Sequence, residues 1–360
     1  MDPENPFGRN RRDTLVPERR PDDLQALDIV HAFRIEGFKG LEVAATLEKK
    51  RDAVGEKGSR NGDAILVDPT SGLLGVFDGL GGEKYADLAS ATASRMTKVS
   101  WDRSLASWTG DTRAIDETFR ENDSDEGAED ILRGDPDFLR KAHALVVSLL
   151  RAHAAVKATG GMTTACVGCV HEQTDGTRWL LTASVGDSGA FIRHDDGTLE
   201  RASREDSNLD RLKDIRGLQL PLLYRMKAEP YRPFEIPRVP HATTFIDLTN
   251  EVPDPLGTEG VIYPKMVLKR LRPGDDVLFC TDGVIDKYEK VVRNVPPESE
   301  MTEEQLDLEV FARAAGNGDT LEERLERLRI TASFRRAYKE VDDIAIVGIH
   351  VPKRLKGRGK

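Results

Sequence analysis

The chain has 360 residues, of which 38% are hydrophobic and 32% charged, and its net charge at pH 7 is −10. A negative chain is repelled by phosphate backbones, which argues against general nucleic-acid binding. The sequence has no run of about 18 apolar residues to span a membrane, and its polar start, MDPENPFGRNRRD, lacks the apolar core of a secretory signal. We therefore expect a cytoplasmic protein that binds neither nucleic acid nor membranes.

The ends of the chain differ in composition from the rest. Residues 1–30 are rich in Arg, Asp and Pro, and residues 353–360 are basic, so we interpret both as loosely ordered tails. The length suits one large sandwich domain over 31–352. The three cysteines, Cys166, Cys169 and Cys280, lie in apolar strand-like runs, which favours buried thiols over disulfides. The spacing of Cys166 and Cys169 predicts side chains on opposite faces of a strand.

A β-hairpin pattern comes first along the chain. Strand-like runs at 64–67 and 73–77 are separated by a Pro- and Gly-containing turn, and the second run ends in the motif GVFDGLGG at 75–82. Asp63 precedes the first run and Asp78 follows the second. Because the outer ends of a hairpin are neighbours, we expect these two carboxylates to lie close together. Each one alone is typical of a turn residue, but a carboxylate at a rigid strand end is also well placed to bind a hard metal ion.

The segments that follow are mostly predicted from periodicity. Apolar residues at helical spacing predict helices over 88–99 and after Pro136, the second being the clearest in the sequence. The acidic stretch 112–137 is interpreted as a solvated loop. Strands are predicted at 163–170, 179–185, 190–193, 276–280 and 344–351, and 301–338 is helical in composition. The long proline-rich segment 203–260 is interpreted as a flap over a site.

Five aspartates share one setting, a strand boundary, and most of them have a neighbouring glycine: Asp63, Asp78, Asp187, Asp282 and Asp342. Converging carboxylates repel one another unless a cation neutralises them. A set of oxygen donors without His or Cys selects Mg²⁺ or Mn²⁺ over Zn²⁺. Two such ions with a water between them suit hydrolysis at a phosphorus atom. Rival chemistries lack their motifs, since the sequence has no G-x-x-x-x-G-K-S/T loop and no G-x-S-x-G elbow.

Six motifs, in this order, resemble those of the metal-dependent serine/threonine protein phosphatases of type 2C, the PPM family. They are SRNGDA at 59–64, GVFDGLGG at 75–82, GMTTA at 161–165, SVGDSGAFI at 184–192, PGDDVLFCTDGVIDK at 273–287 and VDDIAIVGIHV at 341–351. The resemblance covers about residues 55–351. It implies an α+β fold, a four-layer α-β-β-α sandwich with two central antiparallel sheets.

The resemblance also implies a binuclear Mn²⁺ or Mg²⁺ site and roles for its residues. Asp78 would bridge the two ions, and the carbonyl of Gly79 would bind one of them. Asp282 and Asp342 would complete the shell of the other ion, Asp63 would act through bound waters, and Asp187 would help to bind a third, weaker ion. The nucleophile would be the bridging water, and the substrate a phosphorylated protein. Its phosphate would be held by Arg60 or Lys57, because relatives place an arginine where this chain has Gly58.

Three further departures leave other functions open. Relatives carry an acidic residue where this chain has Gly62, often a histidine, a candidate general acid, where it has Leu80, and an arginine where it has Gly189. Gly62 and Leu80 favour a pseudophosphatase, which would keep the fold as a binding module. Retention of Asp78, Asp282 and Asp342 favours the enzyme. A metal-dependent phosphoesterase for a small molecule is a third reading, since the segment 203–260 would set substrate choice. The oligomeric state stays open.

Overall fold

The structure is a computed structural model that describes residues 29–35, 40–49, 61–68, 70–80, 85–204, 255–260, 262–293, 302–334 and 342–353. The predicted tails and the predicted flap at 203–260 lie almost entirely outside the described residues. The two candidate phosphate-binding residues, Lys57 and Arg60, also lie outside the described residues.

Two large antiparallel sheets form the centre of the molecule. One has the strand order β1-β2-β13-β10-β7-β8 and the other β3-β4-β5-β6-β9. The strands of the first sheet are β1 (Ile29–Ile35), β2 (Glu42–Glu48), β7 (Gly189–Arg193), β8 (Leu199–Arg201), β10 (Asp276–Cys280) and β13 (Ile344–His350). Those of the second are β3 (Ala64–Asp68), β4 (Leu73–Phe77), β5 (Ala165–Glu172), β6 (Arg178–Val185) and β9 (Lys265–Leu271).

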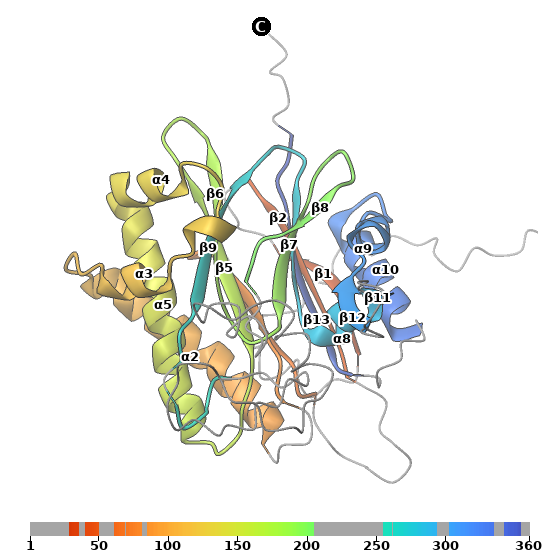
Figure 1. The fold of residues 1–360 in the computed structure, drawn as a ribbon, viewed down its shortest axis with the longest axis horizontal. Coiled ribbons are helices and arrows are strands. Elements are labelled where there is room, and N and C mark those ends of the chain that lie inside the picture. The colour runs from red at the N-terminus through yellow and green to blue at the C-terminus, as the bar shows by residue number, and fades with distance from the viewer. Residues whose placement is uncertain are drawn as a thin grey trace, which may run out of the picture.

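Helices cover the outer face of each sheet, which makes four layers (Figure 1). The long helices α2 (Ala86–Ser107) and α5 (Pro136–Lys157) pack on the second sheet, on the left of the view. The helices α9 (Leu308–Ala315) and α10 (Leu321–Phe334) pack on the first sheet, on the right. The predicted α-β-β-α sandwich is therefore confirmed.

Alternation along the strands explains why the sheets stack in this way. In β4, Val76 faces the core between the sheets, whereas Phe77 faces the helices α2 and α5. Residues along a strand point alternately to its two faces, so each sheet supplies side chains to two separate cores. Cys166 belongs to the core between the sheets and Cys169 to the core under the helices, as their spacing predicts. All three cysteines are unbridged and buried.

Two sequence predictions are wrong. The stretch 112–137 is not a loop, because it contains α3 (Arg113–Thr118), a short 3₁₀ turn (Glu121–Asp123) and α4 (Ala128–Gly134). Two of its few apolar residues, Ile115 and Leu132, are fully buried and hold these short helices on the core. The segment 301–338 is not wholly helical either, since β12 (Thr302–Leu306) pairs with β11 (Glu289–Arg293). Pairing with a distant strand leaves no local signal in the sequence.

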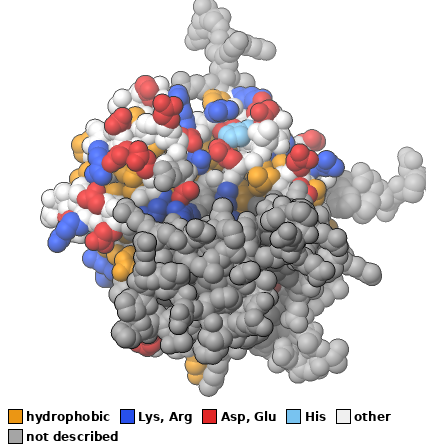
Figure 2. Space-filling model, viewed as in Figure 1, with side chains coloured by type: hydrophobic (Ala, Val, Ile, Leu, Met, Phe, Trp, Pro, Cys, Tyr) orange, Lys and Arg blue, Asp and Glu red, His pale blue; other side chains and the backbone are white. Residues whose placement is uncertain are grey.

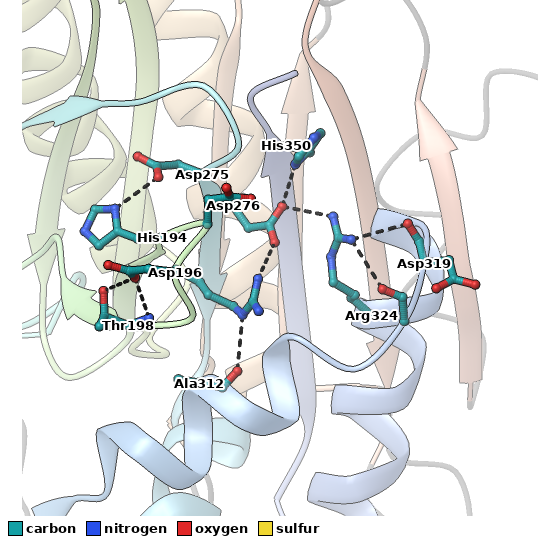
Figure 3. A network of polar contacts seen from close by, with 12 residues as sticks. His194, Asp196, Thr198, Asp275, Asp276, Ala312, Asp319, Arg324 and His350 are labelled. Carbon is teal, nitrogen blue, oxygen red and sulfur yellow. Dashed lines mark hydrogen bonds and ion pairs between the residues drawn. The ribbon is translucent and has the colours of Figure 1, made fainter. Parts of the chain in front are cut away.

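An ionic network lies on the first sheet, at the start of β10 (Figure 3). The buried carboxylate of Asp276 accepts from Arg193 Nη1 at 3.4 Å, from Arg324 Nη2 at 3.0 Å and contacts His350 Nδ1 at 2.8 Å. Arg193 Nε also donates to the carbonyl oxygen of Ala312 in α9. The network therefore ties both outer helices to the sheet.

The described surface in Figure 2 shows acidic and basic side chains interspersed on one face. Ion pairs such as Arg133 with Asp116 and Glu129 belong to this kind of surface, where each partner is roughly half exposed. Among the described residues, no helix combines the length and the apolar character that crossing a membrane requires.

Candidate metal centre

The topology gathers the aspartates at one end of the two sheets. In the second sheet, Ala64 pairs with Phe77, which puts Asp63 and Asp78 side by side, as the hairpin pattern predicts. In the first sheet, Cys280 pairs with Ile346 and with Gly189. The turn from β6 to β7 crosses between the sheets at this same end. All five predicted ligands therefore lie next to strand ends, at the same end of the two sheets: Asp63, Asp78, Asp187, Asp282 and Asp342.

Asp63 is buried and is held from both sheets. Its backbone amide donates to Asn61 Oδ1 at 2.8 Å, which fixes the turn before β3. Its Oδ2 accepts a hydrogen bond from Thr281 Oγ1 at 2.7 Å, and Thr281 follows β10 in the opposite sheet. The carboxylate is thereby fixed at the junction of the two sheets.

The backbone around Asp78 is equally well fixed. The carbonyl oxygen of Asp78 accepts from Thr163 Oγ1 at 2.6 Å and from the Thr164 amide at 2.8 Å. The next residue must be glycine, because a Cβ on Gly79 would lie 2.4 Å from the carbonyl oxygen of Ala86 and 2.5 Å from that of Gly62. The glycine of the D-G pair is thus required by close backbone approach.

Asp187 lies in the turn between the sheets, and an arginine lies next to it. The hydroxyl of the following Ser188 hydrogen-bonds that of Thr164 at 2.6 Å. Arg201 Nη2 donates to the carbonyl oxygen of Asp187 at 3.3 Å, and its guanidinium lies over the ring of Phe191. A Cβ on Gly189 would be 3.2 Å from Arg201 Nη2. Position 189 has no arginine, but the guanidinium of Arg201, at the end of β8, lies beside this turn.

The first sheet supplies three further carboxyl groups. Asp282 begins the short helix α8 (Asp282–Ile285), directly after β10. Asp342 precedes β13, and its Oδ1 accepts from the amide of Asp343 at 2.8 Å. Asp343 itself is buried, and its Oδ2 accepts from the amide of Gly62 at 2.6 Å. Sequence reasoning missed Asp343 and Arg201, and only their neighbours in space identify them.

The electrostatics are those of carboxylates forced together. Burial raises the pKa of Asp63 well above its ordinary value, and repulsion from Asp343 adds to this. Burial likewise raises the pKa of Asp78, with repulsion from Asp63, and that of Asp282, with repulsion from Asp78. Among the described residues, no lysine, arginine or histidine is a main cause of these shifts. A cation would relieve both the burial cost and the repulsion.

The residues fit Mn²⁺ or Mg²⁺ in their chemistry, because every side-chain donor is a carboxylate oxygen. Asp282 Oδ1 is buried and has no hydrogen-bond partner, so a bound cation would supply the polar contact that this oxygen lacks. Asp78 and Asp282 lie close enough for each carboxyl group to affect the pKa of the other. Among the described residues, no group of three or more acidic, His or Cys side chains is already spaced as a metal cage.

The chain matches no protein-family model and no curated protein sequence. Solved structures do match. The PPM Ser-Thr phosphatase MsPP from Mycobacterium smegmatis, in complex with cacodylate, is 18% identical, and the match covers 86% of this chain and 97% of that one with a TM-score of 0.51. A serine/threonine phosphatase of S. agalactiae is 16% identical over 86% of this chain and 99% of its own, with a TM-score of 0.52. The chain therefore has the PP2C-type fold of the PPM phosphatases.

Proposed function

We propose that this chain is a metal-dependent protein phosphatase that hydrolyses phosphoserine and phosphothreonine. The observation that carries the proposal is the convergence of five aspartates from both sheets at one edge of a PP2C-type fold. Catalysis at phosphorus needs concentrated positive charge, and this edge is built to attract it. The likeness to solved phosphatases supports the fold, while the function rests on the site itself.

The roles proposed for the residues are those that the resemblance to the PPM phosphatases implies. Asp63 and Asp282 both act on the pKa of Asp78, which supports the proposal that Asp78 would bridge two ions, with the Gly79 carbonyl as a further ligand of one of them. Asp282 and Asp342 would hold one ion, Asp63 would orient water, and Asp187 would contribute to a third, weaker site. Two Mn²⁺ or Mg²⁺ ions would supply Lewis acidity that lowers the pKa of water and screens the phosphate charge.

Three further residues complete the proposal. Arg60 or Lys57 would bind the phosphate and orient it, since a planar guanidinium or an ammonium matches phosphate oxygens. Leu80 offers no proton to the leaving alkoxide. Its amide donates to the carbonyl oxygen of Met162 at 3.1 Å, which fixes the backbone where relatives carry an imidazole.

Phosphate release from p-nitrophenyl phosphate and from a phosphothreonine peptide tests the proposal. Each substrate is assayed with EDTA, with Mg²⁺ and with Mn²⁺, beside Asp78→Asn, a near-isosteric change that removes one carboxylate. We expect turnover that requires added metal and is lost in the variant, while the variant stays folded by circular dichroism. Equal activity of Asp78→Asn would rule out the two-metal mechanism. Activity on the small ester alone would indicate a small-molecule phosphoesterase.

A second candidate function, a pseudophosphatase, is favoured by two residues: Gly62 has no acidic side chain, and Leu80 has no proton to donate to a leaving alkoxide. A folded wild-type protein without turnover under any of these conditions would support this binding-module reading.

A further inference from the structure

Position 62 lies between an acidic side chain and the backbone of the D-G pair. The Gly62 amide donates to Asp343 Oδ2 at 2.6 Å, and the Gly62 carbonyl oxygen accepts from the Gly79 amide at 3.1 Å. Asp343 is 281 residues away in sequence and only 7% exposed. Gly62 therefore links the Asp343 carboxylate, through its amide and its carbonyl oxygen, to Gly79. The carbonyl of Gly79 is a proposed metal ligand.

The Asp343 carboxylate fills the space where a side chain at position 62 would begin. A Cβ on Gly62 would lie 3.0 Å from Asp343 Oδ2 and 3.4 Å from the carbonyl oxygen of Gly79. A contact of 3.0 Å is closer than carbon and oxygen pack without one of them moving. An acidic side chain at 62 would therefore crowd the Asp343 carboxylate and force it to shift.

The charge agrees with the geometry. Burial is the largest cause of the raised pKa of Asp63, and Asp343 is the strongest single charge that raises it further. Asp343 is also rigidly held, because its amide donates to Asp342 Oδ1 at 2.8 Å and the buried strand β13 follows directly. The side of the centre nearest Asp63 thus has a second carboxyl group, which is held in place from the opposite sheet.

We propose that Asp343 is a positioning residue of the metal centre and takes the place of the acidic side chain missing at Gly62. The inference rests on the proposed metal-dependent function. The Asp343 carboxylate fixes the Gly62 peptide, and with it Gly79, and it restores the negative charge beside Asp63 that attracts the ion. On this view the acidic group lies at Asp343 and not at position 62. Gly62 therefore does not indicate that the metal site is lost.

A charge-relocation cycle tests the inference with four proteins: wild type, Asp343→Asn, Gly62→Glu and the double variant. Asp343→Asn keeps an oxygen that accepts from the Gly62 amide but removes the charge, so it separates electrostatics from structure. Asp175→Asn removes an equal charge from an exposed turn that begins after β5, at the end of the sheet remote from Asp78, and serves as the control. Mn²⁺ affinity is measured by calorimetry, and Tm is measured in EDTA.

We expect Asp343→Asn to weaken Mn²⁺ binding by about 10-fold or more, as loss of groups that orient ligands does. Gly62→Glu should lower Tm in EDTA, because it crowds and repels Asp343. In the double variant the new glutamate should restore Mn²⁺ affinity to within about threefold of wild type and recover most of the Tm.

Two outcomes would overturn the inference alone. One is wild-type Mn²⁺ affinity in Asp343→Asn, and the other is a double variant that binds Mn²⁺ no better than the weaker single variant. A wild-type protein that binds no Mn²⁺ would instead overturn the proposed function, and the metal role of Asp343 with it. The Tm values in EDTA would still show whether positions 62 and 343 compete for one place.

Discussion

Thr281 Oγ1 donates to Asp63 Oδ2 at 2.7 Å, and the same oxygen accepts from the amide of Ala345 at 3.0 Å. One buried hydroxyl therefore links an aspartate of the second sheet to two strands of the first. The link lies at the edge where the proposed ligands converge, so it affects both the stability of the sandwich and the position of Asp63.

Thr281→Val should lower the free energy of unfolding by about 1–3 kcal/mol, because it leaves a buried acceptor and a buried amide without their partner at almost constant volume. Urea unfolding in EDTA measures the change. Thr281→Ser retains the hydroxyl and should lose less than half as much. Equal losses in the two variants would mean that the methyl group, not the hydroxyl, stabilises this junction.

Asp276→Asn should destabilise the fold by about 3–5 kcal/mol, because it leaves Arg193 and Arg324 without a buried counter-charge (Figure 3). The control is Asp111→Asn, which breaks an exposed pair with Arg113 and should cost far less. Asp276 lies at the opposite end of β10 from Asp282, so metal-dependent turnover per folded molecule should remain at the wild-type level. A similar cost for both variants in urea unfolding would contradict the anchoring role of the network.

His171 predicts a loss of stability in mild acid. Its ring stacks on Phe138, contacts Asp135 Oδ2 through Nε2 at 2.9 Å and contacts Lys141 Nζ through Nδ1 at 3.0 Å. A neutral ring with the proton on Nε2 satisfies both contacts. Burial lowers the pKa of His171 below its ordinary value of 6.5, and this outweighs the hydrogen bond to Asp135, which raises it.

The sign follows from proton uptake. Below pH 6.5 the unfolded chain binds a proton at this histidine that the folded chain does not, so the free energy of unfolding falls as the pH falls. Burial raises the pKa of Asp135, but hydrogen bonds from the Phe138 amide and His171 outweigh it and lower that pKa, so Asp135 adds no loss until the pH nears 3.8. Urea unfolding at about pH 7.5 and about pH 5 should show a smaller decrease in His171→Gln than in wild type. An equal decrease would exclude His171 as its source.

Leu80 predicts a strong dependence on the leaving group. Without an imidazole at this position, p-nitrophenyl phosphate, whose leaving group needs no proton, should turn over faster than a phosphothreonine peptide. Leu80→His should raise kcat for the peptide, by at most about 10²-fold, and leave the small ester nearly unchanged. The ratio of the two kcat values is the measurement, and Leu80→Gln, which is polar but not a comparable acid, is the control. An equal gain with Leu80→Gln would assign the effect to polarity.

The proposed role of Arg60 in binding the phosphate predicts that its loss raises KM. Arg60→Ala should raise KM for the phosphopeptide more than it lowers kcat, because the contact is made in the bound ground state as well as in the transition state. Lys57→Ala is the paired variant. A KM effect in Lys57→Ala alone would transfer the role to Lys57.

The sequence determined most of the fold, and it predicts which residues form the candidate metal centre, because both depend on local patterns. The alternation in 64–67 and 73–77 and the turn between them predict the β3–β4 hairpin, and its register places Asp63 next to Asp78. The apolar spacing after Pro136 likewise predicts α5, whose N-cap is Asp135. Where burial and local periodicity agree, neighbours in sequence contain enough information.

Tertiary structure alone decided the rest. The strand at 302–306 has its partner, β11, in another segment, and the short helices within 112–137 depend on burial of isolated residues such as Ile115. Asp343 and Arg201 occupy the space beside Gly62 and Gly189, although nothing near them in sequence indicates it. A glycine in the sequence shows only that a side chain is missing, whereas packing between distant strands decides which other side chain fills the space.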